Sequence, residues 1–166
     1  MTAVLRRWEA RAIGALKGLL GLGLVTMVLL NVANAAGRYG GLPTLTGADE
    51  LLVFGMIWIV MLGAIIATRD RTHLSIDLIH ARMTPAQRRL LLAATGIVMA
   101  ATCAFVAWHS YQFIARIGAL GQTSMGLGIP MVIPHVAILA GFAGMAVVAA
   151  LLAAGDMAVL LAGEGE

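Results

Sequence analysis

Long stretches without a charged side chain alternate with short polar segments along this chain. Four apolar stretches predict membrane-spanning helices at approximately residues 13–36, 47–68, 85–117 and 131–155. Each is close to or longer than the roughly 20 residues that a helix needs to cross the hydrocarbon core. The pattern therefore predicts an all-α integral membrane protein with four transmembrane helices, in a single membrane domain over residues 1–166.

Short polar motifs mark the starts of these helices. Thr84-Pro85-Ala86-Gln87 places a hydroxyl at N-cap, proline at N1 and glutamine at N3, which is a capping-box pattern. Thr46 and Asp49 have the same spacing at the second stretch, so a capping box is predicted there too. Pro130 and Pro134 suit the start of the fourth helix, because proline disrupts a helix interior.

The first apolar stretch also has features of a secretory signal. Basic residues precede it, and Ala33-Asn34-Ala35 has the A-x-A form of a cleavage site. However, the uncharged run from Gly18 to Gly37 is longer than the roughly 7 to 15 residues of a typical signal. A retained transmembrane helix is therefore the preferred interpretation.

The charged residues are few and unevenly placed. They make up 11% of the chain, and 61% is hydrophobic, whereas a soluble domain has about 25% charged residues. Nine of the eleven Lys and Arg residues lie before the first apolar run or within residues 69–89, and the others are Arg38 and Arg116. Cytoplasmic flanks are rich in Lys and Arg, so both termini and the central belt, residues 69–84, are predicted to be cytoplasmic.

The central belt has two interpretations. Leu74, Leu78 and Ile79 fall at helical spacing among polar residues, which suits a short helix lying in the membrane interface. An ordinary solvated loop fits equally well.

Motifs of catalysis are missing from the sequence. It has no H-E-x-x-H, no paired-cysteine metal site and no glycine-rich phosphate loop between a strand and a helix. Cys103, the one cysteine, lies in an apolar run and is interpreted as a small core residue. We predict no enzymatic activity, no cofactor, no metal site and no nucleic-acid partner.

The histidines leave one alternative open. His109 and His135 lie near span ends, where a membrane bundle could ligate haem. However, they flank the same loop, and His73 and His80 lie in the central belt, so no second pair is placed opposite them. A haem-bearing or purely structural membrane anchor of another complex, or a general assembly factor, remains an alternative.

Polar groups that could carry a solute are scarce within the spans. Glu50 lies in the first turn of the second helix, where a carboxylate interacts favourably with the helix N-terminus. A small stand-alone four-helix transporter is a further alternative, but it needs a carboxylate deeper in the membrane. Small residues recur every four positions, which favours close helix packing, at Gly14/Gly18, Gly96/Ala100/Ala104 and Ala146/Ala150/Ala154.

Four motifs in this order resemble a known family. They are Arg38-Tyr39; Glu50 followed by Trp58 and Gly63; His73 to Asp77 with Pro85 to Arg89; and Gly121 to Pro130. The chain resembles, from about Val25 to Gly155, the small (Q, DctQ-type) membrane subunit of tripartite ATP-independent periplasmic (TRAP) transporters. One departure is Gly47, at a position where the family often has tryptophan.

The resemblance implies a supporting role in transport. In such systems a periplasmic substrate-binding protein captures an organic acid, and a large (M) membrane subunit moves it inward, usually with sodium. The small subunit packs against the large one in the lipid bilayer of the bacterial inner membrane and helps to dock the binding protein. The interface residues implied for this chain are Arg38, Glu50, Trp58, Arg69, Arg71, His73, Asp77, Arg116 and Gln122.

Overall fold

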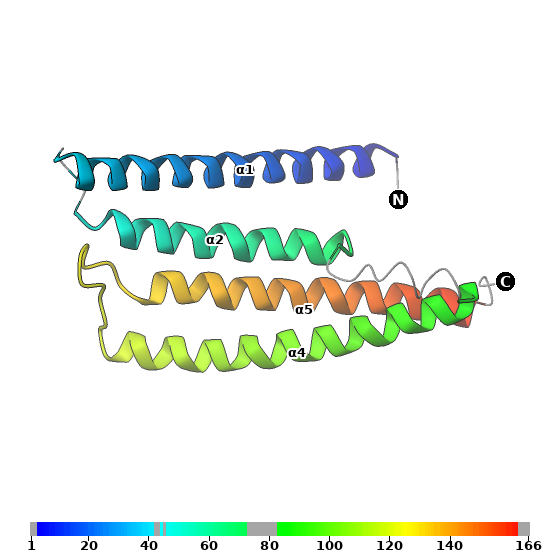
Figure 1. Ribbon diagram of the computed structural model, residues 1–166. Coiled ribbons are helices and arrows are strands. Elements are labelled where there is room, and N and C mark those ends of the chain that lie inside the picture. The colour runs from blue at the N-terminus through cyan, green and yellow to red at the C-terminus, as the bar shows by residue number, and fades with distance from the viewer. Residues whose placement is uncertain (1–2, 42–43, 45, 73–82, 163–166) are drawn as a thin grey trace. The chain divides into compact units, whose positions relative to one another are not determined.

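Helices dominate the secondary structure of this protein. The computed structural model describes residues 3–41, 44, 46–72 and 83–162. Within these residues, four helices follow one another along the chain (Figure 1): α1 (Ala3–Gly40), α2 (Ala48–Arg69), α4 (Pro85–Ala119) and α5 (Val132–Leu161). Each of them is long and apolar enough to cross a membrane. The prediction of an all-α protein with four membrane-spanning helices is therefore confirmed.

Several helices extend beyond the predicted spans. α1 begins at Ala3 and not near Ile13, and α5 continues to Leu161 and not only to Gly155. The prediction followed the apolar run, which ends where charged residues begin. Backbone hydrogen bonding in a helix is local, so it continues through polar turns that lie beyond the apolar run.

The start of α4 has the predicted capping box. The Gln87 N–H donates to Thr84 Oγ1 at 3.3 Å, and the Thr84 N–H donates to Gln87 Oε1 at 3.0 Å. Both bonds satisfy backbone donors that a helix N-terminus leaves without intrahelical partners.

The predicted capping box at the start of α2 is wrong. The carbonyl oxygen of Gly47 accepts the N–H groups of Glu50 and Leu51 at 3.1 and 3.2 Å, so Gly47 occupies the N-cap position in place of Thr46. Gly47 has a φ of 80°, a left-handed conformation that glycine adopts without a steric cost. The Asp49 carboxylate is consequently available for contacts outside its own helix.

The chain divides into two compact units. The first comprises Met1–Gly63 and Ile114–Ala137, and the second comprises Ala64–Phe113 and Ile138–Glu166. In the first unit α1 and α2 are antiparallel neighbours, because Gly23 lies against Ile59 and Met27 lies against Gly55. Glycine at these positions leaves room for the side chain of the facing helix.

The second unit is held together by small residues between long helices. A Cβ atom added at Gly96 of α4 would lie 2.9 Å from Ala153 Cβ of α5. The buried positions of α5 recur every four residues, at Met145, Ala149 and Ala153. The predicted α5 stripe was one residue out of place, since Ala150 and Ala154 are exposed.

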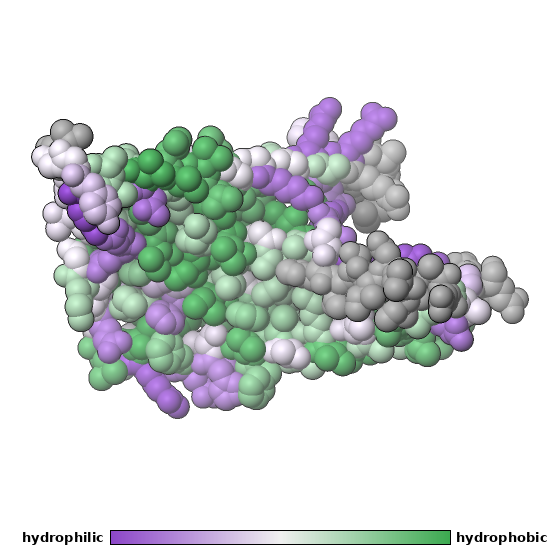
Figure 2. Space-filling model, viewed as in Figure 1, coloured by the Kyte–Doolittle hydropathy of each residue, from purple (hydrophilic) through white to green (hydrophobic). Residues whose placement is uncertain are grey.

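Two expected packing positions on α1 have no neighbour among the described residues. Cβ atoms added at Gly14 or Gly18 would meet nothing within 4 Å in the described structure. Large apolar side chains are also exposed on this helix, with Leu22 65% and Leu29 63% exposed. Figure 2 shows hydrophobic residues over a broad area of the visible face. Such a surface suits contact with lipid or a membrane partner.

Threonine hydroxyl groups within the described helices are satisfied locally. The Oγ1 atoms of Thr68, Thr95 and Thr102 each donate to the carbonyl four residues earlier, at 2.8 to 2.9 Å. Such bonds remove the cost of placing a hydroxyl in an apolar environment. These threonines therefore need no solute or water as a partner.

Candidate functional site

Asp49 links the end of α1 to the start of α2 in the first unit. Its Oδ2 accepts a hydrogen bond from Arg38 NH2 at 2.9 Å, and its Oδ1 lies 3.4 Å from Asn34 Nδ2. The Arg38 and Asp49 side chains are 61% and 69% exposed. An ion pair this exposed contributes at most about 1 kcal/mol to stability, so its main effect is to orient the two helix ends.

Glu50 holds the segment between α4 and α5, residues 120–131, here called the α4–α5 loop. Glu50 Oε1 accepts the Gly126 N–H at 2.6 Å, and Oε2 accepts the Leu127 N–H at 2.9 Å. The Ser124 hydroxyl also hydrogen-bonds to this carboxylate. Both carboxylate oxygens are therefore used to fix the turn of the loop.

The α4–α5 loop also has hydrogen bonds of its own. The Ser124 N–H donates to the Ile129 carbonyl at 2.8 Å, and the Met131 N–H donates to the Gln122 carbonyl at 3.0 Å. Ile129 N–H additionally donates to Ser124 Oγ at 3.1 Å. These bonds form a small hairpin, and the side chain of Met125 at its turn is fully exposed.

Leu127 packs on the N-cap of α2. A Cβ atom added at Gly47 would lie 2.5 Å from Leu127 Cγ, closer than real side chains approach. Together with the positive φ of Gly47, this contact explains why a bulky aromatic residue does not fit at this position of the chain. Gly47 instead lets the loop approach the helix start closely.

Adjacent residues of α2 therefore fix two different segments. Asp49 binds the end of α1, and Glu50 binds the α4–α5 loop. We call Arg38, Asp49, Glu50 and the α4–α5 loop the junction surface. A cavity of about 600 Å³ opens on it, lined on the α2 side by Asp49, Glu50, Val53 and Phe54, and on the loop side chiefly by Gln122, Thr123, Ser124 and Met125.

Five of the candidate interface residues belong to this first unit. Arg38, Glu50 and Gln122 all belong to the junction surface, where Arg38 contacts Asp49 and where Glu50 and Gln122 line the cavity. Arg116 is exposed in the last turn of α4, and Trp58 is half-buried in the middle of α2. Trp58 therefore lies outside the junction surface.

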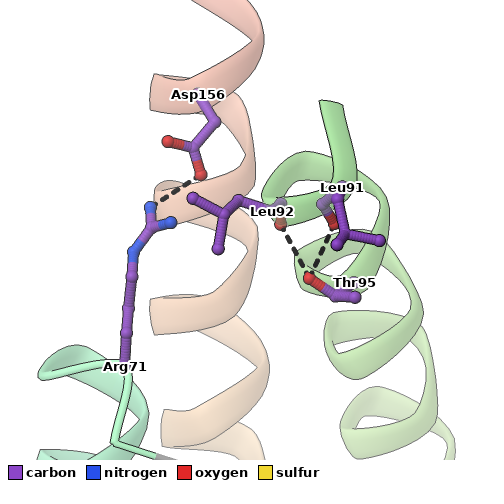
Figure 3. A network of polar contacts seen from close by, with 5 residues as sticks. All are labelled: Arg71, Leu91, Leu92, Thr95 and Asp156. Carbon is purple, nitrogen blue, oxygen red and sulfur yellow. Dashed lines mark hydrogen bonds and ion pairs between the residues drawn. The ribbon is translucent and has the colours of Figure 1, made fainter. Parts of the chain in front are cut away.

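Two further candidates lie at the end of α2 in the second unit. Arg71 NH2 donates to Asp156 Oδ2 at 2.7 Å, and Figure 3 shows this bond joining the end of α2 to α5. Arg69 NH1 lies 3.2 Å from Asp70 Oδ1. His73 and Asp77 lie outside the described residues, as does the expected interfacial helix of the central belt.

Sequence reasoning missed two carboxylates that organise these contacts. Asp49 was assigned to a helix cap, and Asp156 was given no role. A signal for Asp156 did exist, because an isolated acid that follows the run without Asp, Glu, Lys or Arg from Ile117 to Gly155 lies near the membrane boundary. The nearby central belt is rich in arginine, its natural partner.

The described residues of the two units form no evident catalytic arrangement. Among the described residues, no group of three His, Cys, Asp or Glu side chains could hold a metal ion. In the first unit, His135 Nδ1 lies 2.7 Å from the Met131 carbonyl oxygen. In the second, the His109 ring packs edge-on against Phe105 with centroids 4.4 Å apart. The described residues instead provide loops that are fixed by hydrogen bonds and charged side chains that are exposed.

Comparison with known proteins identifies the family of this chain. The chain matches the family described as "Tripartite ATP-independent periplasmic transporters, DctQ component" over residues 27–158. It is also 25% identical over 131 residues to the "Isethionate TRAP transporter permease protein DctMQ" of Oleidesulfovibrio alaskensis. That match covers 75% of this chain but 21% of the relative, so the chain spans about a fifth of the relative's length. Because the family match covers most of its residues, the chain belongs to the DctQ family of TRAP transporter components, which confirms both the resemblance and the prediction that it is not an enzyme.

Proposed function

We propose that this chain is the small membrane subunit of a TRAP transporter in the bacterial inner membrane. In this proposal it packs against the large (M) membrane subunit and stabilises its scaffold. Its loops help to dock a periplasmic substrate-binding protein during ion-coupled uptake of an organic acid. The chain itself does not contact the transported acid.

The observation that carries the docking role is the double linkage at the start of α2. Asp49 and Glu50 hold the end of α1 and the α4–α5 loop through side-chain hydrogen bonds. A surface loop fixed before its partner arrives loses less conformational entropy on binding. The junction surface is thus suited to repeated, reversible association with another protein.

The exposed groups of the first unit have the composition of a protein-binding surface. Tyr39 is 90%, Leu120 72% and Met125 104% exposed, and Arg38 and Arg116 are exposed cations. Aromatic residues, methionine and arginine are enriched at interfaces. Rim charges adjust the encounter rate and the choice of partner more than the final affinity.

The apolar interiors of the helices support a structural role in the membrane. No Asp, Glu, Lys or Arg occurs in residues 51–68, 90–115 or 133–155. Intramembrane charges normally mark the path of an ion or polar solute. The scarcity of such groups supports a subunit that packs beside a transport path formed by another chain.

The relative supports a large-subunit partner. The name of the relative, DctMQ, contains the letters of both membrane subunits, M and Q. This chain matches 21% of the relative's length. A longer permease that contains a DctQ-like segment is what fusion of the two membrane subunits would produce. Close association of this chain with a separate large subunit follows as the simplest arrangement.

The test uses the purified complex and the exposed turn of the α4–α5 loop. Met125→Glu places a charge on the fully exposed side chain, and Leu161→Glu makes the same kind of change at an 82% exposed residue of the second unit. We expect Met125→Glu to weaken binding-protein association and uptake, with assembly of the two membrane subunits unchanged. Leu161→Glu should alter neither.

Two outcomes would contradict the proposal. Unchanged affinity of the binding protein for the Met125→Glu complex would remove the loop from the docking surface. Solute uptake by this chain alone in vesicles would show that it is a complete transporter. That result would favour the stand-alone four-helix alternative.

A further inference from the structure

A cavity of about 330 Å³ lies at the start of α4 in the second unit. Its walls are formed by Met83, Pro85, Arg88, Arg89, Leu92 and Asp156. Two arginines and one carboxylate thus share a single space with three apolar residues. This cavity lies outside the junction surface, and no step of the proposed transport role uses it.

The carboxylate of this cavity is already neutralised by a third arginine. Arg71 NH2 lies 2.7 Å from Asp156 Oδ2, and the Asp156 side chain is only 13% exposed. In Figure 3 the Arg71 side chain extends from the end of α2 to Asp156, with Leu92 close by. Within the described part of the chain, neither Arg88 nor Arg89 pairs with a carboxylate. The cavity therefore carries excess positive charge.

The helix start adds to this charge without offering a complete site. The N-terminus of α4 carries a partial positive charge. However, the Gln87 N–H already binds Thr84 Oγ1, and the Arg88 N–H binds the Thr84 carbonyl at 2.9 Å. We therefore assign the direct contacts to an anion to the guanidinium groups of Arg88 and Arg89, which line the cavity.

The surroundings distinguish a lipid from a free anion. No Asp, Glu, Lys or Arg follows from Leu90 to Ala115, so the two arginines stand at the edge of the apolar span. Leu90, Ile97 and Val98 of the same helix are each more than half exposed. A ligand with an anionic group and long hydrocarbon chains would use both the arginines and this apolar surface, whereas inorganic phosphate would use only the arginines.

We propose that Arg88 and Arg89 bind the phosphate group of a phospholipid whose acyl chains lie along α4. Guanidinium groups match phosphate oxygens with paired N–H donors. Asp156, which lines the cavity, is paired with Arg71, and this leaves Arg88 and Arg89 available. Bound lipid anchors the start of α4 at the membrane boundary.

The test measures lipid binding to the full-length chain in detergent, at fixed ionic strength because salt screens exposed charges. The probes are dioctanoyl phosphatidylglycerol, dioctanoylglycerol and inorganic phosphate, and the readout is the shift of the thermal unfolding midpoint with probe concentration. The variants are Arg88→Gln/Arg89→Gln and, as a matched control that removes two exposed arginines elsewhere, Arg7→Gln/Arg11→Gln. Arg88→Lys/Arg89→Lys retains the charge, so it checks that weakened binding does not arise from misfolding.

The phosphate-bearing lipid should stabilise the wild type most. Arg88→Gln/Arg89→Gln should lower its affinity about 25-fold, since each basic residue near a membrane surface contributes about fivefold. The lysine variant should retain only part of the affinity, because it keeps the charge and loses the paired N–H donors, and the control variant should retain all of it. Equal loss in the control, equal stabilisation by dioctanoylglycerol, or equal stabilisation by inorganic phosphate would each overturn the proposal.

Discussion

Glu50 and Gly126 are 76 residues apart in the sequence, yet the Glu50 carboxylate accepts the Gly126 N–H at 2.6 Å. The next amide, that of Leu127, binds the other oxygen of the same carboxylate. A side chain in the first turn of α2 thereby sets the conformation of a distant loop. The preceding residue, Asp49, holds the end of α1 through its hydrogen bond with Arg38.

The first prediction concerns this carboxylate. Glu50→Gln should increase the hydrogen-exchange rates of the Gly126 and Leu127 amides, because one of its two acceptor oxygens becomes an NH2 group that cannot accept. Glu50→Ala should increase both rates further. Asp49→Asn is the control, since Asp49 contacts α1 and not the loop. Equal exchange in the wild type and Glu50→Ala would show that the loop holds its shape unaided.

The second prediction concerns the exposed pair Arg38–Asp49. Arg38→Gln and Asp49→Asn should each change the free energy of unfolding by less than about 1 kcal/mol, because both side chains are well solvated. Their effect on the association rate of a docking partner should be larger at low salt than at high salt. Chemical unfolding and stopped-flow binding measure the two quantities. A stability loss well above this limit would mean that the pair is buried in the assembled protein.

The third prediction concerns Arg71 and Asp156, whose side chains are 35% and 13% exposed. Arg71→Met should lower the free energy of unfolding by about 1–3 kcal/mol, because it leaves a mostly buried carboxylate without its partner. Arg71→Met/Asp156→Asn should recover part of this loss, since no charge is then left behind. Unfolding in detergent measures both variants. Strictly additive losses would indicate that the two residues act independently.

The fourth prediction concerns packing at Gly96. Gly96→Val should destabilise the second unit by about 1–3 kcal/mol, because a Cβ atom there would lie 2.9 Å from Ala153 Cβ. Gly18→Val is the matched control, as a Cβ at Gly18 meets nothing within 4 Å in the described structure. Comparable unfolding midpoints for the two variants would place α4 and α5 further apart than described here.

The fifth prediction concerns orientation in the membrane. The distribution of Lys and Arg predicts cytoplasmic termini, which places the segment after α1 on the opposite side. In a Cys103→Ala background, a membrane-impermeant maleimide applied to intact cells should label Gly41→Cys and leave Ala86→Cys and Ala162→Cys unlabelled. Permeabilised cells should label all three. The reverse pattern in intact cells would invert the topology.

Much of the fold could be predicted because helices in a membrane depend on local properties. Backbone hydrogen bonds form within each helix, and a run of apolar residues is sufficient to indicate a span. The capping box of Thr84 and Gln87 could be predicted from the sequence for the same reason, since its two residues are three positions apart. The box expected at Thr46 failed because Gly47 occupies the N-cap position, and Asp49 instead pairs with Arg38.

The interface candidates were only partly predictable. Arg38 and Glu50 were proposed as interface residues from the family resemblance, and in the structure each contacts another segment of this chain. Nothing in the sequence indicated that the partner of Glu50 would be backbone amides, because such donors are identical in every loop. Asp156 was overlooked because its partner, Arg71, is 85 residues away.

By itself, the sequence determined the four membrane-crossing helices and the distribution of charge along the chain, since both depend on neighbouring residues. Only the tertiary structure decided which face of α5 is buried, which loop Glu50 holds and which arginine Asp156 neutralises. Helix rotation and long-range pairing depend on the shape of the facing helix. On α5 the buried positions are Met145, Ala149 and Ala153. The stripe expected from the sequence was one residue further along the helix and therefore lies on a different side of it.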